Sequence, residues 1–213
     1  MRAFLWALPA YGTLLGLSTL THQPPTSDFD AYAEYVTTGV FLVSHLGASI
    51  FGAALAILGV FGLASSLGRS RSAVAGLALT TVANVFLAAS FGSAAFVQPG
   101  LGRAHLAGVP GMAVINDDTA YGPALFVTAL SASFLLVVAA VVTGVALFRA
   151  DRRLRPYGIA YAALITLFVA GIAVPVVQPF AGFGLAVATG LLAVHGVRSA
   201  ATSAGSVRPA LIT

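Results

Sequence analysis

The chain has 213 residues, of which 59% are hydrophobic and only 8% are charged, and its formal net charge is +4. A soluble domain needs about a quarter of its residues to be charged, so this composition excludes a soluble globular protein and indicates an integral membrane protein. The absence of cysteine excludes disulfides, thiolate catalysis and cysteine-ligated metal centres. The basic residues form no cluster with interleaved aromatic residues, so the positive charge does not indicate a nucleic-acid partner.

Six apolar segments predict an all-α, polytopic membrane protein with a single transmembrane domain over residues 1–198. The first segment has one arginine and an apolar run, as a signal peptide has, but no clear cleavage site follows it, so we interpret it as a helix. Residues 199–213 are expected to form a disordered cytoplasmic tail. The expected membrane-spanning helices cover residues 3–21, 36–66, 73–97, 122–148, 157–177 and 181–198.

The arginines predict how the chain is oriented, because basic residues collect in loops on the cytoplasmic side of a membrane. Only Arg103 falls on the opposite side from the other nine, which are Arg2, Arg69, Arg71, Arg149, Arg152, Arg153, Arg155, Arg198 and Arg208. Both termini are therefore expected to be cytoplasmic, in a multi-pass protein of a bacterial plasma (inner) membrane. The lipid bilayer is thus an expected partner. Self-association and membership of a larger membrane complex are left open.

Three Gln-Pro pairs indicate an internal repeat of three tandem helical hairpins. They begin at Gln23, Gln98 and Gln178, and each is expected to end an outgoing helix. The segments 40–50 and 124–134 also align without gaps, which pairs Ser49 with Ser133, Glu34 with Asp118, and His45 with Ala129. A coincidence between two Ala/Val/Leu/Ser-rich strings is the alternative. If the repeat is real, the helix scaffold itself does not require a histidine at position 45.

His45 is the central candidate for function, because an ionisable residue inside a membrane-spanning segment is expensive. It lies beside a stripe of small residues at every fourth position, Ser44, Ala48, Gly52 and Ala56. A rise of 1.5 Å per residue places His45 roughly 12 Å below the outer surface, level with Ser90 and Ser131. We therefore expect an outward-facing polar pocket between the second, third and fourth helices, covered by the 98–120 loop. Its expected ligand-binding residues are His45, Ser49, Asn84, Ser90 and Ser131, with Glu34, Asp117 and Asp118 at the mouth.

Three functions fit these features. The preferred one is non-enzymatic binding or transport of a small solute or lipid in this pocket. The second is an outer-leaflet enzyme in which histidines and carboxylates of the outer loops, with His22, His105 and Asp28 as weak metal-ligand candidates, act on a substrate. The third is an accessory subunit of a larger complex, in which Gly76, Asn84 and Gly92 would face a partner. For each polar residue the alternative is a structural role, either packing between helices or an ordinary solvated loop.

No cofactor is expected. A single haem between His45 and His195 is disfavoured, because these histidines are expected in opposite halves of the bilayer, whereas a haem needs two ligands at similar depth.

Overall fold

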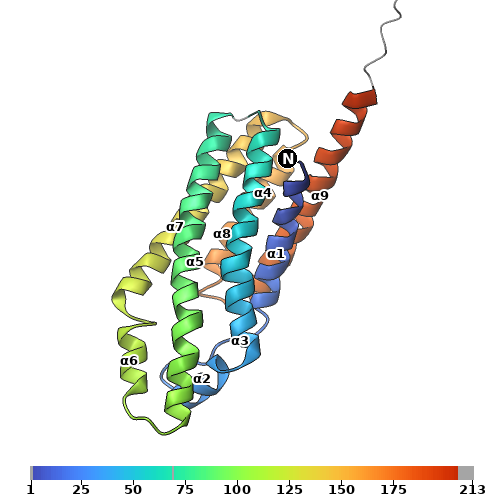
Figure 1. Ribbon diagram of the computed structural model, residues 1–213. Helices are drawn as coiled ribbons and strands as arrows, with labels where there is room; N and C mark the ends of the chain where they lie inside the picture. Colours follow the sequence, from blue (N-terminus) through green and yellow to red (C-terminus); the bar gives the residue numbers. More distant parts are fainter. Residues whose placement is uncertain (1, 69, 206–213) are drawn as a thin grey trace, which may run out of the picture.

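A computed structural model describes residues 2–68 and 70–205, and every regular element in this part of the chain is helical (Figure 1). Four stretches are long and apolar enough to cross a membrane, namely Gly39–Ser66, Arg71–Leu106, Pro123–Ala150 and Val177–His195. Two further apolar helices, Ala3–Ser18 and Arg155–Ala170, are shorter. The protein is therefore all-helical, with several apolar helices that are compatible with membrane insertion.

The elements follow one another with short connections. The stretch Gly39–Ser66 consists of three consecutive parts, of which the middle one is π-helical. In chain order the elements are a 3₁₀ helix (Arg2–Trp6), α1 (Ala7–Ser18), α2 (Phe29–Val36), α3 (Gly39–Ser44), a π-helical segment (His45–Phe51), α4 (Gly52–Ser66), α5 (Arg71–Leu106), α6 (Met112–Asp118), α7 (Pro123–Ala150), α8 (Arg155–Ala170) and α9 (Val177–Gly205).

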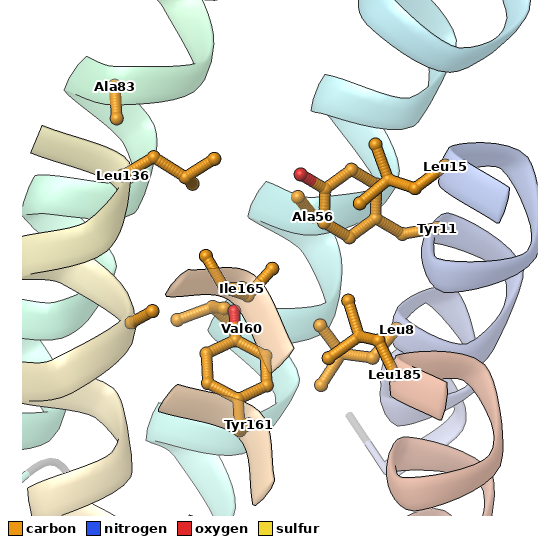
Figure 2. Packing of buried hydrophobic residues seen from close by; sticks show 11 residues of the cluster. Leu8, Tyr11, Leu15, Ala56, Val60, Ala83, Leu136, Tyr161, Ile165 and Leu185 are labelled. Carbon is orange, nitrogen blue, oxygen red and sulfur yellow. The ribbon is translucent and has the colours of Figure 1, made fainter. Parts of the chain in front are cut away.

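Six of these helices form a closed ring, in which α1, α4, α5, α7, α8 and α9 each pack against the next and α9 returns to α1. Apolar side chains from all six meet in one core cluster, which Figure 2 shows in the middle of the bundle. Close van der Waals packing of these side chains inside the ring holds the helices in a fixed arrangement. The cluster comprises Leu8, Tyr11, Leu15, Ala56, Val60, Ala83, Leu136, Ala140, Tyr161, Ile165 and Leu185.

Glycines allow α1 and α9 to approach closely where they close the ring. Gly12 and Gly16 lie four residues apart on α1, and a Cβ on Gly12 would lie 2.5 Å from the backbone nitrogen of Ala186. A Cβ on Gly182 of α9 would likewise meet the backbone of Gly16. Small residues at this spacing let the backbones of two membrane helices touch, which is where such helices gain most of their packing energy.

A cap formed by α2, α6 and the last turns of α5 covers one end of the ring. The helix α5 has 36 residues, about 54 Å, so its last turns extend beyond the ends of α1 and α8 (Figure 1). Both α2 and α6 pack against this extension. The apolar centre of the cap contains Phe29, Tyr32, Val36 and Phe41, with Met112 of α6 packed against them.

The predicted loop over residues 98–120 is wrong, because α5 continues through Pro99 to Leu106 and α6 follows it. Proline removes one backbone hydrogen bond within a helix. The turns beyond Pro99 are nonetheless held in place by α2, since Gly102 is buried and a Cβ there would lie 2.8 Å from Cγ2 of Val36. Packing against the cap therefore outweighs the local helix-breaking effect.

The other Gln-Pro pairs also differ from the expectation of three equivalent helix ends. Gln23 follows the end of α1 at Ser18, whereas Gln178 and Pro179 lie in the first turn of α9, where a proline is tolerated. The predicted helix over 157–177 ends early, at Ala170, and turns occupy residues 171–176. The helix α9 begins before residue 181 and runs to Gly205. The rest of the predicted tail lies outside the described residues.

Candidate functional site

A cavity of about 370 Å³ lies inside the ring of helices. Its wall is formed by α1, the π-helical segment, α5, α7, α8 and the residues just after α1 and α8, with one residue each from α3 and α9. It adjoins the last turns of α1 and α8, at Leu15 and Phe168, and the first turn of α9, at Gln178. On α5 it lies near the middle of the helix, at Asn84. None of the described residues that line it is charged.

His45 is the first residue of the π-helical segment, and its ring lines the cavity. Its Nδ1 lies 3.0 Å from the carbonyl oxygen of Phe41 and 3.2 Å from Oγ of Ser44. A carbonyl oxygen can only accept a hydrogen bond, so Nδ1 carries the hydrogen and Nε2 of the neutral ring keeps a free lone pair. Within the described part of the chain, Nε2 has no hydrogen-bond partner. The ring also packs on Phe41, with their centroids 4.0 Å apart, which fixes its orientation.

The π-helical segment determines which side chains of this span reach the cavity. Its backbone bonds link each residue to the fifth before it, as the amide of Gly52 does with the carbonyl oxygen of Gly47. Such wide turns are rare, and where they interrupt an α-helix they frequently lie at functional sites. His45, Ala48 and Ser49 of this segment line the cavity.

Several polar groups on the cavity wall make no side-chain hydrogen bond to any described residue. Serines in apolar helices usually donate to a carbonyl one turn back. Ser49 and Ser133 line the cavity, and neither makes such a bond to any described residue. Asn84 is 2% exposed and donates from Nδ2 to the carbonyl oxygen of Thr80 at 2.9 Å, while its Oδ1 has no partner in the described chain. The hydroxyl of the buried Tyr11 is also unpaired among these residues.

The predicted pocket is therefore present in part. His45, Ser49 and Asn84 line one cavity, as the sequence suggested. Ser90 does not line it, because its hydroxyl donates to the carbonyl oxygen of Phe86 at 2.9 Å. Ser131 is exposed on the outside of α7. Both serines were placed by depth alone, and depth along a helix does not determine which face a side chain occupies.

Other residues of the cavity were missed by the sequence analysis. Ser133 could have been found, since the alignment of 40–50 with 124–134 pairs it with Ser49, and both line the cavity. Tyr11 and Gln178 had no comparable signal, because the sequence does not show that the first and last helices of the ring meet the second span. Gln178 donates from Nε2 to the carbonyl oxygen of Phe168 at 3.2 Å.

The acidic residues expected at the mouth lie elsewhere. Glu34 on α2 and Asp117 and Asp118 on α6 are exposed on the cap, and none lines the cavity. They are held away from it because α2 and α6 fold as helices against the extension of α5. Burial raises the pKa of the Tyr32 phenol above its usual range; neighbouring Tyr121 and Asp117 raise it further, while the hydrogen bond with Asn116 opposes the shift.

The candidate metal ligands do not converge. His105 pairs with Asp30 at 2.6 Å, Asp28 accepts from the backbone of Ala31 as the N-cap of α2, and His22 is exposed. Within residues 2–68 and 70–205 there is no group of three or more His, Asp or Glu side chains that could hold a metal ion. His22, His105 and Asp28, which the sequence offers only as weak metal-ligand candidates, are not brought together in such a group.

His195 lies far from the cavity along α8. Its Nδ1 is 3.0 Å from the hydroxyl of Tyr157 in the first turn of that helix, whereas Phe168 of the cavity lies in the last turn. These two turns are about 16 Å apart. The absence of a haem between His45 and His195 stays a prediction.

The small residues of α5 face other helices of the same chain. Gly76, Asn84 and Gly92 are all buried. A Cβ on Gly76 would lie 2.5 Å from Oγ1 of Thr143 on α7, and one on Gly92 would lie 3.2 Å from Cδ1 of Ile50. The exposed stripe that would have favoured an accessory subunit is thus not present on this helix.

Comparison of the chain with protein-family models, with curated proteins and with solved structures finds no match. The functional interpretation therefore depends on the geometry of the cavity and on the chemistry of its wall.

Proposed function

We propose that this chain is a non-enzymatic protein of the bacterial plasma membrane that binds or transports a small solute or lipid in the cavity between its helices. The observation that carries the proposal is a cavity of about 370 Å³ with unpaired polar groups on its wall. Protein interiors are close-packed, so a void of this size costs stability, and polar groups that face it without a partner can form hydrogen bonds with an occupant. A bundle that served only as a scaffold would gain by filling this space. The volume is also in the usual range for small-molecule sites.

The proposed topology has six membrane-crossing segments as three tandem hairpins, with both termini in the cytoplasm. The shared core supports it, because α1 and α8 contribute to the same cluster as the four longer spans. The arginines of the sequence support the orientation, since nine of the ten fall on one side. The regular part of α8 is about 24 Å long, so the apolar turns after Ala170 would complete its crossing.

Each polar group has a defined role in this proposal. Nε2 of His45 and Oδ1 of Asn84 accept hydrogen bonds from the ligand. The hydroxyls of Tyr11, Ser49 and Ser133 donate or accept, according to what the ligand presents. These groups come from four different elements of the ring, so they surround the ligand on several sides.

A thermal-unfolding screen tests the proposal. The purified protein is unfolded in detergent in the presence of each member of a library of uncharged small molecules. A compound that binds the folded state raises the unfolding temperature. Ala48→Leu fills the cavity from the π-helical segment, and Ala54→Leu is its matched control, since Ala54 is exposed on α4. We expect compounds that stabilise the wild type and Ala54→Leu but not Ala48→Leu. Counterflow in proteoliposomes with such a compound then separates transport from binding. If no compound distinguishes the two variants, the proposal is wrong.

A further inference from the structure

We propose that the ligand is an uncharged, lipophilic molecule with at least one hydrogen-bond donor, and that it reaches the cavity sideways from the hydrocarbon of the bilayer. This inference rests on the proposed function, because it specifies what the same cavity binds and from which side the ligand comes.

The two most exposed residues of the cavity wall are apolar, whereas the polar residues Ser18, Thr19, Ser44 and Gln178 of the same wall are half-buried. Among its described lining residues only Phe91 of α5 and Ile172, just after α8, are exposed, at 39% and 62%. An opening to water would be bordered by polar or charged side chains, and the acidic residues of the outer cap do not line the cavity. The two exposed residues of the wall, Phe91 and Ile172, are instead ones that favour contact with lipid chains.

The early end of α8 explains why an opening lies there. The helix α7 is 12 residues longer than α8, about 18 Å, and the short 151–154 connection starts α8 beside the end of α7. The other end of α7 therefore continues past the last turn of α8 (Figure 1). This part of α7 exposes Phe126 and Phe134, at 58% and 69%, and the turns after α8 expose Val174. The exposed surface of these two segments is thus apolar.

The inside of the cavity determines the chemical class of the ligand. No described lining residue carries a charge, so a charged ligand would be buried without a counter-charge, which is strongly unfavourable. A wholly apolar ligand would leave Nε2 of His45 and Oδ1 of Asn84 unpaired. Leu87, Leu136 and Phe168 provide apolar surface for the remainder of the molecule. An uncharged amphipathic molecule that donates a hydrogen bond satisfies both parts of the wall.

A pair of photoreactive probes tests the class of ligand. The protein is reconstituted in vesicles and irradiated with a trifluoromethyl-diazirinyl benzyl alcohol, which is uncharged, or with the corresponding benzoate, which is anionic. Peptide mass spectrometry locates the labelled residues. An excess of plain benzyl alcohol, which lacks the diazirine, competes with the probe and shows which part of the labelling is saturable. We expect saturable labelling of cavity residues by the alcohol and none by the benzoate. In Ser133→Leu it should fall roughly tenfold, which corresponds to about 1.4 kcal/mol, because the leucine side chain takes up space that the alcohol needs. Ser131→Leu, on the outside of the same helix, should keep it.

A second pair of variants tests the route. Ile172→Gln places a polar amide at an exposed position of the cavity wall, whereas Val176→Gln changes an exposed residue that does not line the cavity. The initial rate of labelling by the alcohol should fall about fivefold in Ile172→Gln. This corresponds to an increase of roughly 1 kcal/mol in the barrier to entry, because the lipophilic alcohol must move past a polar amide. It should not change in Val176→Gln. Equal rates in the two variants would overturn access from the bilayer.

The remaining outcomes separate this inference from the proposed function. Saturable labelling by the benzoate as strong as that by the alcohol would refute the ligand class, while binding in the cavity would stand. Equal labelling of Ser133→Leu and Ser131→Leu would show that the alcohol reacts on the lipid-facing surface, which also refutes the inference. If the alcohol labels no cavity residue although the thermal screen finds a ligand, only the inference fails. If the screen finds none either, both fail.

Discussion

Replacing Asn84 by leucine should make the protein more stable and weaken ligand binding. Asn84 is 2% exposed inside an apolar bundle, and its Oδ1 has no partner in the described chain. If the residue is kept for a ligand, removing the amide relieves a cost that the folded protein otherwise carries. If it is kept for structure, the same change should weaken the fold.

The expected size follows from the hydrogen bonds. An unpaired buried polar atom costs about 1–3 kcal/mol, whereas a typical hydrogen bond contributes a net of about 1 kcal/mol. Asn84→Leu removes the unpaired Oδ1 and loses only the bond from Nδ2 to the carbonyl oxygen of Thr80. That carbonyl oxygen keeps its helical partner, the backbone amide four residues on. Leucine has the same branching as asparagine, and its larger methyl groups can extend into the cavity that Asn84 lines, so the packing change is small. We therefore expect a net stabilisation of about 1 kcal/mol, with a smaller ligand-induced stabilisation.

The assay is unfolding in mixed micelles of a mild detergent and dodecyl sulfate, followed by circular dichroism. Tyr32→Phe in the cap is a suitable control, because the hydroxyl of this buried residue donates a hydrogen bond to Oδ1 of Asn116 at 3.1 Å. The substitution leaves that buried Oδ1 unpaired and should destabilise the protein by about 1–3 kcal/mol. If Asn84→Leu is destabilised to the same extent, Asn84 has a structural role and the reasoning is refuted.

Two further predictions concern the ring and the cap. Gly182→Ala should destabilise the protein by roughly 1–3 kcal/mol, because its Cβ would meet the backbone of Gly16. Gly100→Ala should leave the stability unchanged, because no atom lies within 4 Å of its Cβ. Unfolding in mixed micelles measures both variants. Burial raises the pKa of the Tyr32 phenol in the folded protein above the ordinary value of about 10. The neutral phenol therefore contributes its full stabilisation of the cap below about pH 10. This contribution is lost as the pH rises further, because the phenol then ionises. Ultraviolet titration should show a late-ionising tyrosine that is missing in Tyr32→Phe; a titration unchanged by that substitution would contradict the prediction.

The general class of the fold could be predicted because it follows from composition. A chain with 8% charged residues must bury most of its surface in itself or in lipid, and helices satisfy their own backbone groups. The boundaries could not be predicted where tertiary packing decides them. Pro99 is a helix-breaking signal in sequence, yet α5 passes through it because Gly102 packs against Val36. The contact between α1 and α9 was missed for the same reason, since Gly12 and Gly182 are far apart in sequence.

The candidate site could be predicted only where polarity is unusual for its surroundings. His45 and Asn84 stand out as polar residues in apolar runs, and both line the cavity. Ser131 was preferred to Ser133 because depth was the only criterion, and two residues along a helix correspond to opposite faces. The π-helical segment was not predictable from the pattern of residues, although it determines how Ser49 is directed.

His45→Phe separates the role of the imidazole in binding from its role in packing. Phenylalanine can keep the contact with the ring of Phe41, and the carbonyl oxygen of Phe41 still accepts from Oγ of Ser44 at 2.9 Å. The stability of the protein should therefore change little. What is lost is Nε2, which we expect to accept a hydrogen bond from the ligand. Naphthol and naphthalene differ by one hydroxyl, so the ratio of their affinities reports this bond.

In the wild type naphthol should bind more tightly than naphthalene by a factor between about fivefold and a hundredfold, since leaving a buried acceptor unpaired costs about 1–3 kcal/mol. In His45→Phe that ratio should fall towards the one set by Asn84 and the cavity hydroxyls alone. His105→Phe is the matched control, because His105 pairs with Asp30 in the cap and does not line the cavity. An unchanged ratio in His45→Phe would show that the imidazole belongs to the packing of the π-helical segment, because a group that contacts the ligand hydroxyl cannot be removed without a change in this ratio.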